Sequence, residues 1–161
     1  MIGLLQDIKD QRPKGVRYLG LDIGQKTIGL AVSNDAGTVA TPLETIQRSK
    51  FSKDLEQLAK IIAEYEIGGF ILGWPVDMHG DEVMLTAQCD RVRSFADELA
   101  KQKDVVGPNP WIALWDESFS TKTVEEFLIK DVDMSRTKRA QVVDKLAAQV
   151  ILQSALECIL A

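Results

Sequence analysis

The chain has 161 residues, of which 45% are hydrophobic and 27% charged, a balance typical of a folded globular protein and not of a disordered one. Its net charge of −5, from 19 basic and 24 acidic residues, provides no global positive field and disfavours a polyanionic partner. No apolar run approaches the roughly 18 residues of a membrane span, and the N-terminal residues lack the basic start and apolar core of a signal peptide, so we expect a cytoplasmic protein without a membrane partner.

Three short strands are predicted close to the N-terminus, after a lead-in over residues 1–15. They cover residues 18–24, 27–33 and 39–46, and turn-forming Asn, Asp and Gly residues separate them. Strands joined by such short connections are expected to pair antiparallel.

Helices and buried strands alternate in the rest of the chain. A helix is predicted over residues 52–65, where Leu and Ile recur at helical spacing until Gly68 and Gly69 stop it. The remaining elements follow from the same periodicity and length rules: buried strands over 70–74 and 111–115, and helices over 82–101, 121–130 and from about 135 to the C-terminus.

This order of elements, βββαβαβαα, predicts a single α/β domain. Its sheet is expected to be mixed and five-stranded, because three antiparallel strands precede strands that helices connect in parallel. Helices are expected on both faces of the sheet.

Acidic residues lie at the ends of two of the predicted strands. Asp22 lies near the end of the first strand among apolar and glycine neighbours, and Asp116 and Glu117 directly follow the strand over 111–115. Functional groups of open α/β sheets gather at strand carboxyl ends. A carboxylate in apolar surroundings also needs a partner. Backbone amides of a turn for Asp22, and of a helix start for Asp116, are the alternatives to a functional role.

Asp144 heads an otherwise small and apolar face of the last helix, which it shares with Ala148, Ile151 and Ala155. This face is expected to pack against the sheet, where an unpaired carboxylate would cost several kcal/mol. The partner is either Lys138 or Lys145, or a divalent cation shared with other carboxylates.

Convergence of Asp22, Glu117 and Asp144, with Asp116 as a further candidate, would create a site of hard oxygen donors that suits Mg²⁺ or Mn²⁺. Such ions can activate water and stabilise the leaving oxygen in phosphodiester cleavage without a side-chain nucleophile. That chemistry fits a chain whose single histidine, His79, excludes a multi-histidine site, and whose two cysteines have no metal-binding spacing.

Basic residues gather around the start of the last helix, beside Asp144: Arg136, Lys138, Arg139 and Lys145. They form either a solvated helix face or contacts to a phosphate backbone. Lys26, in the glycine-rich first turn, is a candidate for another phosphate contact. The chain is therefore acidic overall but basic where phosphates would lie.

Five segments together resemble the YqgF/RuvX family, the RuvC-like branch of the RNase H superfold, over about residues 18–156. In the family's order, they are GLDIGQKTIG (20–29), TPLET (41–45), GWPVDMHG (73–80), WDESFST (115–121) and DKLAA (144–148). The resemblance implies an RNase H-like nuclease domain over residues 16–161, with Asp22, Glu117 and Asp144 as catalytic, metal-binding carboxylates.

The family is associated with maturation of the 5′ end of precursor 16S rRNA, and some members are described as Holliday junction resolvases. We therefore expect an endonuclease that acts on structured nucleic acid, with precursor rRNA as the leading substrate and four-way DNA junctions as the alternative. A homodimer would favour the junction, because symmetric nicks need two active sites.

Two other classes of function are considered. A non-catalytic nucleic-acid-binding factor in transcription or ribosome assembly would use the same basic cluster. The glycine-flanked strand of Asp22 is also similar to the phosphate loop of actin-like ATPases and sugar kinases, but those enzymes need a second domain that this chain is too short to contain.

The sequence departs from the family pattern at two arginine positions, now occupied by Thr27 and Ser118. The loop after the fourth strand also carries Trp74, Asp77 and His79 where Leu, Asn and Asp are more usual. The three carboxylates are kept, whereas two guanidinium groups that would clamp phosphates are lost.

Overall fold

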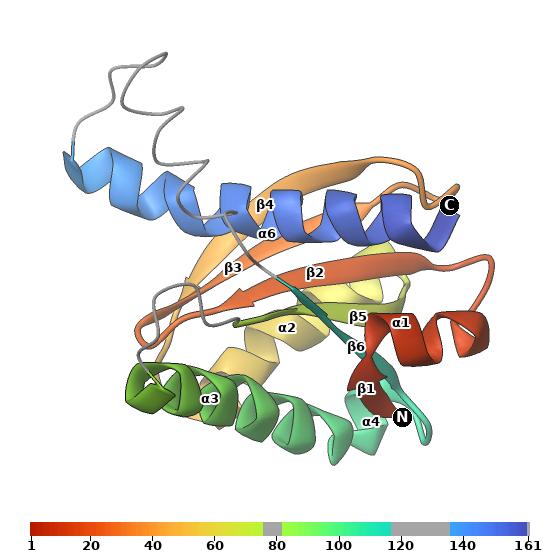
Figure 1. The fold of residues 1–161 in the computed structure, drawn as a ribbon, viewed down its shortest axis with the longest axis horizontal. Helices are drawn as coiled ribbons and strands as arrows, with labels where there is room; N and C mark the ends of the chain where they lie inside the picture. Colours follow the sequence, from red (N-terminus) through yellow and green to blue (C-terminus); the bar gives the residue numbers. More distant parts are fainter. Residues whose placement is uncertain (76–81, 117–135, 161) are drawn as a thin grey trace.

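A mixed six-stranded sheet forms the middle layer of the computed structural model, which describes residues 1–75, 82–116 and 136–160 (Figure 1). The strand order is β1-β6-β5-β2-β3-β4. Strands β2, β3 and β4 pair antiparallel, whereas the pairs β2–β5, β5–β6 and β6–β1 are parallel. The strands are β1 (Ile2–Leu4), β2 (Arg17–Ile23), β3 (Thr27–Ser33), β4 (Ala40–Gln47), β5 (Ile67–Trp74) and β6 (Trp111–Asp116).

Helices cover both faces of the sheet, as predicted for a mixed α/β domain (Figure 1). The long helix α6 lies across one face, and α2 and α3 pack against the other. None of the helices in the described ranges has the length and apolar character needed to cross a membrane. The helices are α1 (Leu5–Ile8), the 3₁₀ helix η1 (Lys9–Gln11), α2 (Phe51–Tyr65), α3 (Glu82–Ala100), α4 (Lys103–Val106) and α6 (Arg136–Leu160).

The sixth strand comes from the segment expected to be a lead-in, so the predicted number of five strands is wrong. β1 pairs with β6 along Ile2 to Leu4, and the following Leu5 is completely buried. The Trp111 indole of β6 donates a hydrogen bond to the Ile8 carbonyl at 2.9 Å. A three-residue strand is too short to show a period, so its pairing with a distant strand has no local sequence signal.

Gly68 and Gly69 do not stop helix α2, contrary to the prediction, because they lie inside β5. The helix ends at Tyr65, and the following Glu66 adopts a left-handed conformation with φ 53°. A Cβ at Gly68 would lie 2.6 Å from the Val16 Cβ, and one at Gly69 would lie 2.7 Å from a ring carbon of Tyr18. The glycines therefore make room for side chains at the start of β2.

The other predicted elements that fall on described residues agree with the structure to within a few residues at each end, whereas the short helices α1, η1 and α4 were not predicted. The predicted helix over 121–130 lies outside the described residues.

Candidate metal centre

The site begins at the edge of the sheet where the parallel strands β2, β5 and β6 end. Asp22, the penultimate residue of β2, is half-buried there. It is the register partner of Gly29 on β3, and side chains directly opposite each other in an antiparallel pair point to the same face. Gly29 faces α6, so the Asp22 side chain points to the face that α6 covers.

Gly29 lets the backbone of α6 lie directly on β3. A Cβ at this position would be 1.9 Å from the carbonyl oxygen of Asp144 and 2.9 Å from the amide nitrogen of Lys145. Because Gly29 is also the neighbour of Asp22 across the strand pair, this contact brings Asp22 and Asp144 to one part of the sheet face. These two of the three predicted carboxylates thus lie on the same face and at the same edge.

Asp144 is half-buried, and its face of the helix packs as predicted. Ala148, Ile151 and Ala155 are all buried against the sheet. The Thr27 hydroxyl donates a hydrogen bond to Asp144 Oδ2. Lys145 makes no ion pair with Asp144 in the part of the chain that the structure describes, so this hydroxyl is the partner that the sequence did not suggest.

Asp116 lies at the same strand end but on the other side of the sheet. Ile112 and Leu114 belong to the core beneath α2 and α3, and Asp116 continues their alternation along β6 as an exposed residue. The sheet therefore separates Asp116 from the face that Asp22 and Asp144 share.

Several predicted site residues or their side chains lie outside the part of the chain that the structure describes. Glu117, the predicted third ligand, is not described, nor are the side chains of Arg136, Lys138 and Arg139. Within residues 1–75, 82–116 and 136–160, no three His, Cys, Asp or Glu side chains gather as a metal site would require. The described contribution to such a site is the pair Asp22 and Asp144.

The chemistry of this pair fits a divalent cation. Two half-buried carboxylates supply hard oxygen donors, the ligands that Mg²⁺ and Mn²⁺ prefer. The neighbouring strands offer glycine on both sides of Asp22: Gly29 on β3, and on β5 Gly73, which follows the partner of Leu21. Neither glycine places a side chain beside the carboxylate.

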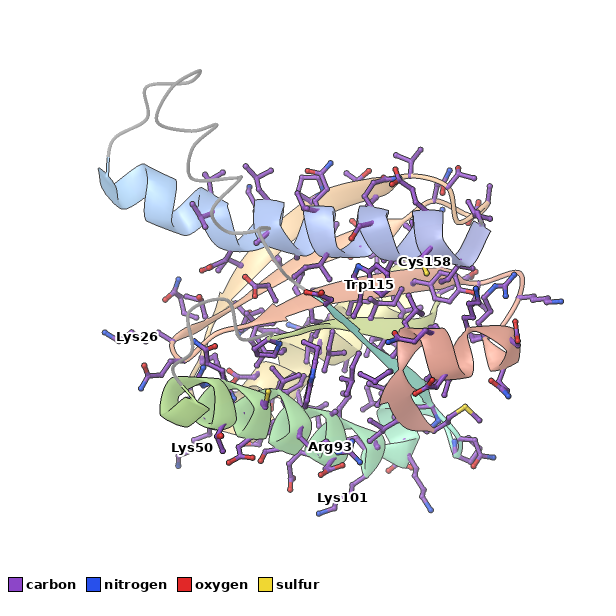
Figure 2. All side chains as sticks on the ribbon, viewed as in Figure 1. Lys26, Lys50, Arg93, Lys101, Trp115 and Cys158 are labelled. Carbon is purple, nitrogen blue, oxygen red and sulfur yellow. The ribbon has the colours of Figure 1, made fainter. Side chains whose placement is uncertain are left out.

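Lys26 and Lys145 are the predicted phosphate contacts that the structure describes. Lys26 is exposed in the turn between β2 and β3 and extends away from the end of the sheet (Figure 2). Lys145 is half-buried and follows Asp144 on α6. Both therefore lie at the edge that carries the two carboxylates.

Arg48 holds the turn that carries Lys26, a role that sequence reasoning missed. Its guanidinium Nη1 donates to the Gly24 carbonyl at 2.8 Å, and its backbone amide donates to the Lys26 carbonyl at 2.8 Å. The guanidinium also lies 5.8 Å from the centre of the Phe95 ring. Arg48 follows β4 in a polar stretch without a motif, so the sequence offered no signal for it.

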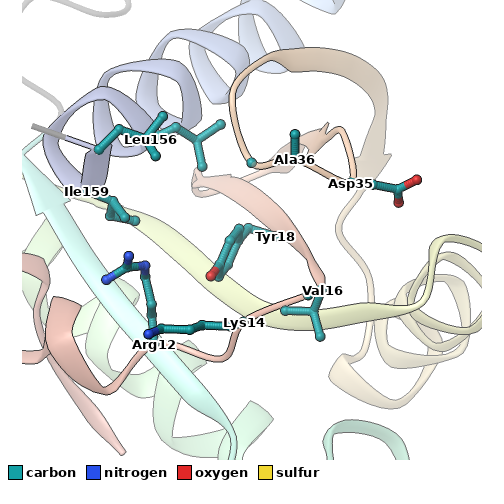
Figure 3. A pocket seen from close by; sticks show the side chains of 11 residues that line it. Arg12, Lys14, Val16, Tyr18, Asp35, Ala36, Leu156 and Ile159 are labelled. Carbon is teal, nitrogen blue, oxygen red and sulfur yellow. The ribbon is translucent and has the colours of Figure 1, made fainter.

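A cavity of about 170 Å³ lies at the opposite end of β2 (Figure 3). Arg12, Lys14 and Tyr18 line it together with Leu156 near the end of α6, which is about 18 Å along the helix axis from Asp144. Burial raises the pKa of the Tyr18 hydroxyl above its usual value, and the nearby Arg12 partly offsets this effect. This cavity is thus separate from the edge that carries the carboxylates.

Known proteins match this chain over most of its length. A family model described as "RuvX: Holliday junction resolvase" matches residues 16–158. A "Putative pre-16S rRNA nuclease" of Rhodospirillum centenum is 42% identical over 153 residues, which cover 95% of this chain and 79% of that protein. A protein of the same name from Paramagnetospirillum magneticum is 48% identical over 141 residues, which cover 88% of this chain and 85% of that protein.

Among solved structures, Thermus thermophilus RuvC in complex with a Holliday junction substrate aligns with a TM-score of 0.49 and 13% identity, covering 91% of this chain and 96% of that one. The family model spans β2 to β6 and α6 but begins after β1.

Proposed function

This chain belongs to the RuvX family, and on that premise we propose that it is a divalent-metal-dependent endonuclease that hydrolyses phosphodiester bonds in structured nucleic acid. The observation that carries the proposal is the approach of Asp22 and Asp144 through Gly29, at the edge where the parallel strands end. Two half-buried carboxylates at the carboxyl ends of parallel strands support a cation site.

The substrate proposed is the 5′ end of precursor 16S rRNA. This choice rests on the relatives that carry the pre-16S rRNA nuclease name at 42% and 48% identity. The family model's description names Holliday junction resolution, so a four-way DNA junction is the alternative substrate.

In the proposed site, Asp22, Asp144 and Glu117 hold Mg²⁺ or Mn²⁺. The bound ion supplies Lewis acidity, which activates water and stabilises negative charge on the leaving oxygen. The two described carboxylates are fixed by the sheet and by α6, so the site is held by rigid elements. Lys26 and Lys145, with Arg136, Lys138 and Arg139, bind backbone phosphates of the substrate.

The charge distribution has a consequence for substrate selection. A net charge of −5 gives little long-range attraction for nucleic acid, so non-specific binding at physiological salt should be weak. Selectivity then depends on the shape of the substrate and on local phosphate contacts.

The test is a cleavage assay with Mn²⁺ that compares a precursor 16S rRNA 5′ leader with a four-way DNA junction. We expect the wild type to cleave the leader, and Asp22→Asn and Asp144→Asn each to abolish cleavage while the thermal unfolding midpoint stays close to the wild-type value. Asp35→Asn is the matched control, because Asp35 is 87% exposed and paired with Arg17 at the other end of β2.

Retained cleavage in both active-site variants would overturn the proposal. A protein that binds the leader but neither cleaves it nor binds Mn²⁺ would instead be the non-catalytic factor. Faster cleavage of the junction would select the alternative substrate, and sedimentation analysis would then be expected to show the homodimer that two symmetric nicks require.

We place this activity in the cytoplasm. Cys89 and Cys158, both in the described part of the chain, are not joined by a disulfide, and cysteines without a disulfide are usual in a reducing compartment.

A further inference from the structure

Thr27, the first residue of β3, contacts the proposed metal centre through its side chain. Its hydroxyl donates a hydrogen bond to Oδ2 of Asp144, a residue 117 positions later in the chain. We propose that Thr27 is a positioning residue that orients the Asp144 carboxylate for a divalent ion. This inference rests on the metal-dependent function proposed above.

The backbones on both sides of this hydrogen bond are fixed independently of it. Gly24 donates a backbone hydrogen bond to the Thr27 carbonyl at 2.8 Å, which closes the turn before β3. Gly29, two residues further along, lies directly against the Asp144 backbone. The freedom left at this contact is therefore the side-chain torsion of Asp144.

The Thr27 hydroxyl removes that freedom. An aspartate side chain has three staggered χ1 wells and a broad χ2 distribution, so an isolated carboxylate at this position would sample several directions. Threonine is β-branched, half-buried and stiff at χ1, so its hydroxyl is itself held in place. A hydrogen bond to an ionised carboxylate is among the stronger ones in proteins, and it selects one carboxylate orientation.

Among the described residues, nothing occupies the second carboxylate oxygen, which is therefore the one offered to a cation. Asp144 accepts no other hydrogen bond from the described residues, so Oδ1 is the atom that this arrangement presents. Residues that hydrogen-bond to a metal ligand commonly change metal affinity or activity about 10- to 100-fold when they are replaced. Thr27 is such a residue, because its hydroxyl hydrogen-bonds to Asp144.

Thr27 also gives a reason for the departure from the family's arginine at this position. A guanidinium group near Asp144 could donate to the same oxygen, but its positive charge would compete with a cation for the carboxylate. A hydroxyl donates the hydrogen bond without adding charge. The threonine thus orients the ligand without placing a positive charge beside it.

The experiment is calorimetric titration of Mn²⁺ into the full chain carrying Thr27→Val, Thr27→Ser or no change. Valine keeps the β-branched shape but lacks the hydroxyl, so we expect roughly 10- to 100-fold weaker Mn²⁺ binding. Serine keeps the hydroxyl, and its affinity should stay close to that of the wild type. A merely structural role would not be rescued by serine, which loses the methyl group and keeps only the hydrogen bond.

Thr41→Val is the matched control, because Thr41 is exposed on β4 and pairs with Val32, about 17 Å along β3 from Thr27. It should leave Mn²⁺ affinity unchanged. Circular dichroism checks that each variant is folded, and Thr27→Ala provides a second hydroxyl-free variant if valine disturbs the strand.

The outcomes separate this inference from the proposed function. Wild-type affinity in both Thr27→Val and Thr27→Ala, with affinity lost in Asp144→Asn, would overturn the role of Thr27 and leave the metal centre intact. Absence of Mn²⁺ binding in the wild type would overturn both proposals. Weak binding in the valine variant that saturating Mn²⁺ restores to near wild-type cleavage would support both.

Discussion

Replacing Gly29 by alanine perturbs the contact on which the geometry of the proposed site depends. The added Cβ would lie 1.9 Å from the carbonyl oxygen of Asp144 and 2.2 Å from its carbonyl carbon. Ordinary van der Waals contact begins at 3.4 Å, so the two backbones would have to separate by about 1.5 Å. The obstructing atoms are backbone atoms, so no side-chain rotation can relieve the clash.

Two effects of different size follow from this displacement. Overpacking of a close contact destabilises a protein by roughly 1–3 kcal/mol. For a chain of this length, such a loss corresponds to a fall of the unfolding midpoint of roughly 2–12 °C. Activity should fall further, because a misplacement of about 1 Å commonly costs a factor of about 100 in rate.

Gly20→Ala is the matched comparison for this variant. A Cβ at Gly20 would lie 2.7 Å from the Leu152 Cβ and 3.2 Å from the Ala148 carbonyl oxygen, so the change disturbs the seating of the same helix away from Asp144. We expect a similar loss of stability in both variants but a much larger loss of Mn²⁺-dependent cleavage in Gly29→Ala. Cleavage at the wild-type rate in Gly29→Ala, measured well below its unfolding midpoint, would refute this reasoning.

Three further predictions follow from other parts of the structure. Lys26→Ala should weaken substrate binding and reduce the slope of log K against log salt by about 1, as measured by fluorescence anisotropy, and an unchanged slope would exclude a phosphate contact. Arg48→Met should destabilise the fold by about 1 kcal/mol in urea unfolding through loss of the hydrogen bond to Gly24, and it should also raise KM by loosening the turn of Lys26. Burial raises the pKa of Tyr18 above 10.0, so above that pH the unfolded chain loses a proton that the folded chain keeps. Stability should therefore fall as pH rises past 10, and Tyr18→Phe should fall less steeply in alkaline urea titrations.

Local sequence patterns predicted the elements that carry the site. The strand over 27–33 has the boundaries that its apolar residues and flanking turn residues indicated. The buried face of α6 below Asp144 followed from the small apolar residues at helical spacing. Asp22 could be placed at a strand end for the same reason, since strand ends are visible in the alternation and the following glycine.

The remaining features depend on contacts between distant parts of the chain. β1 is stabilised by pairing with β6, and Gly68 and Gly69 are required by the side chains of Val16 and Tyr18. The role of Thr27 depends on a residue 117 positions away, so the sequence showed only a missing arginine. Such long-range packing overrides the local meaning of a glycine or a threonine.

The most direct test of the central claim is an NMR titration of the ¹⁵N-labelled chain with Mn²⁺, because the paramagnetic ion broadens the amides nearest to it. We predict that broadening begins at the amides of Asp22, Gly29 and Asp144 and is weaker at those around Tyr18 and Asp35, at the other end of β2, at the same concentration. The same titration of Asp144→Asn should show no selective broadening. Broadening centred elsewhere, or equal in the wild type and the variant, would contradict a metal centre formed by Asp22 and Asp144.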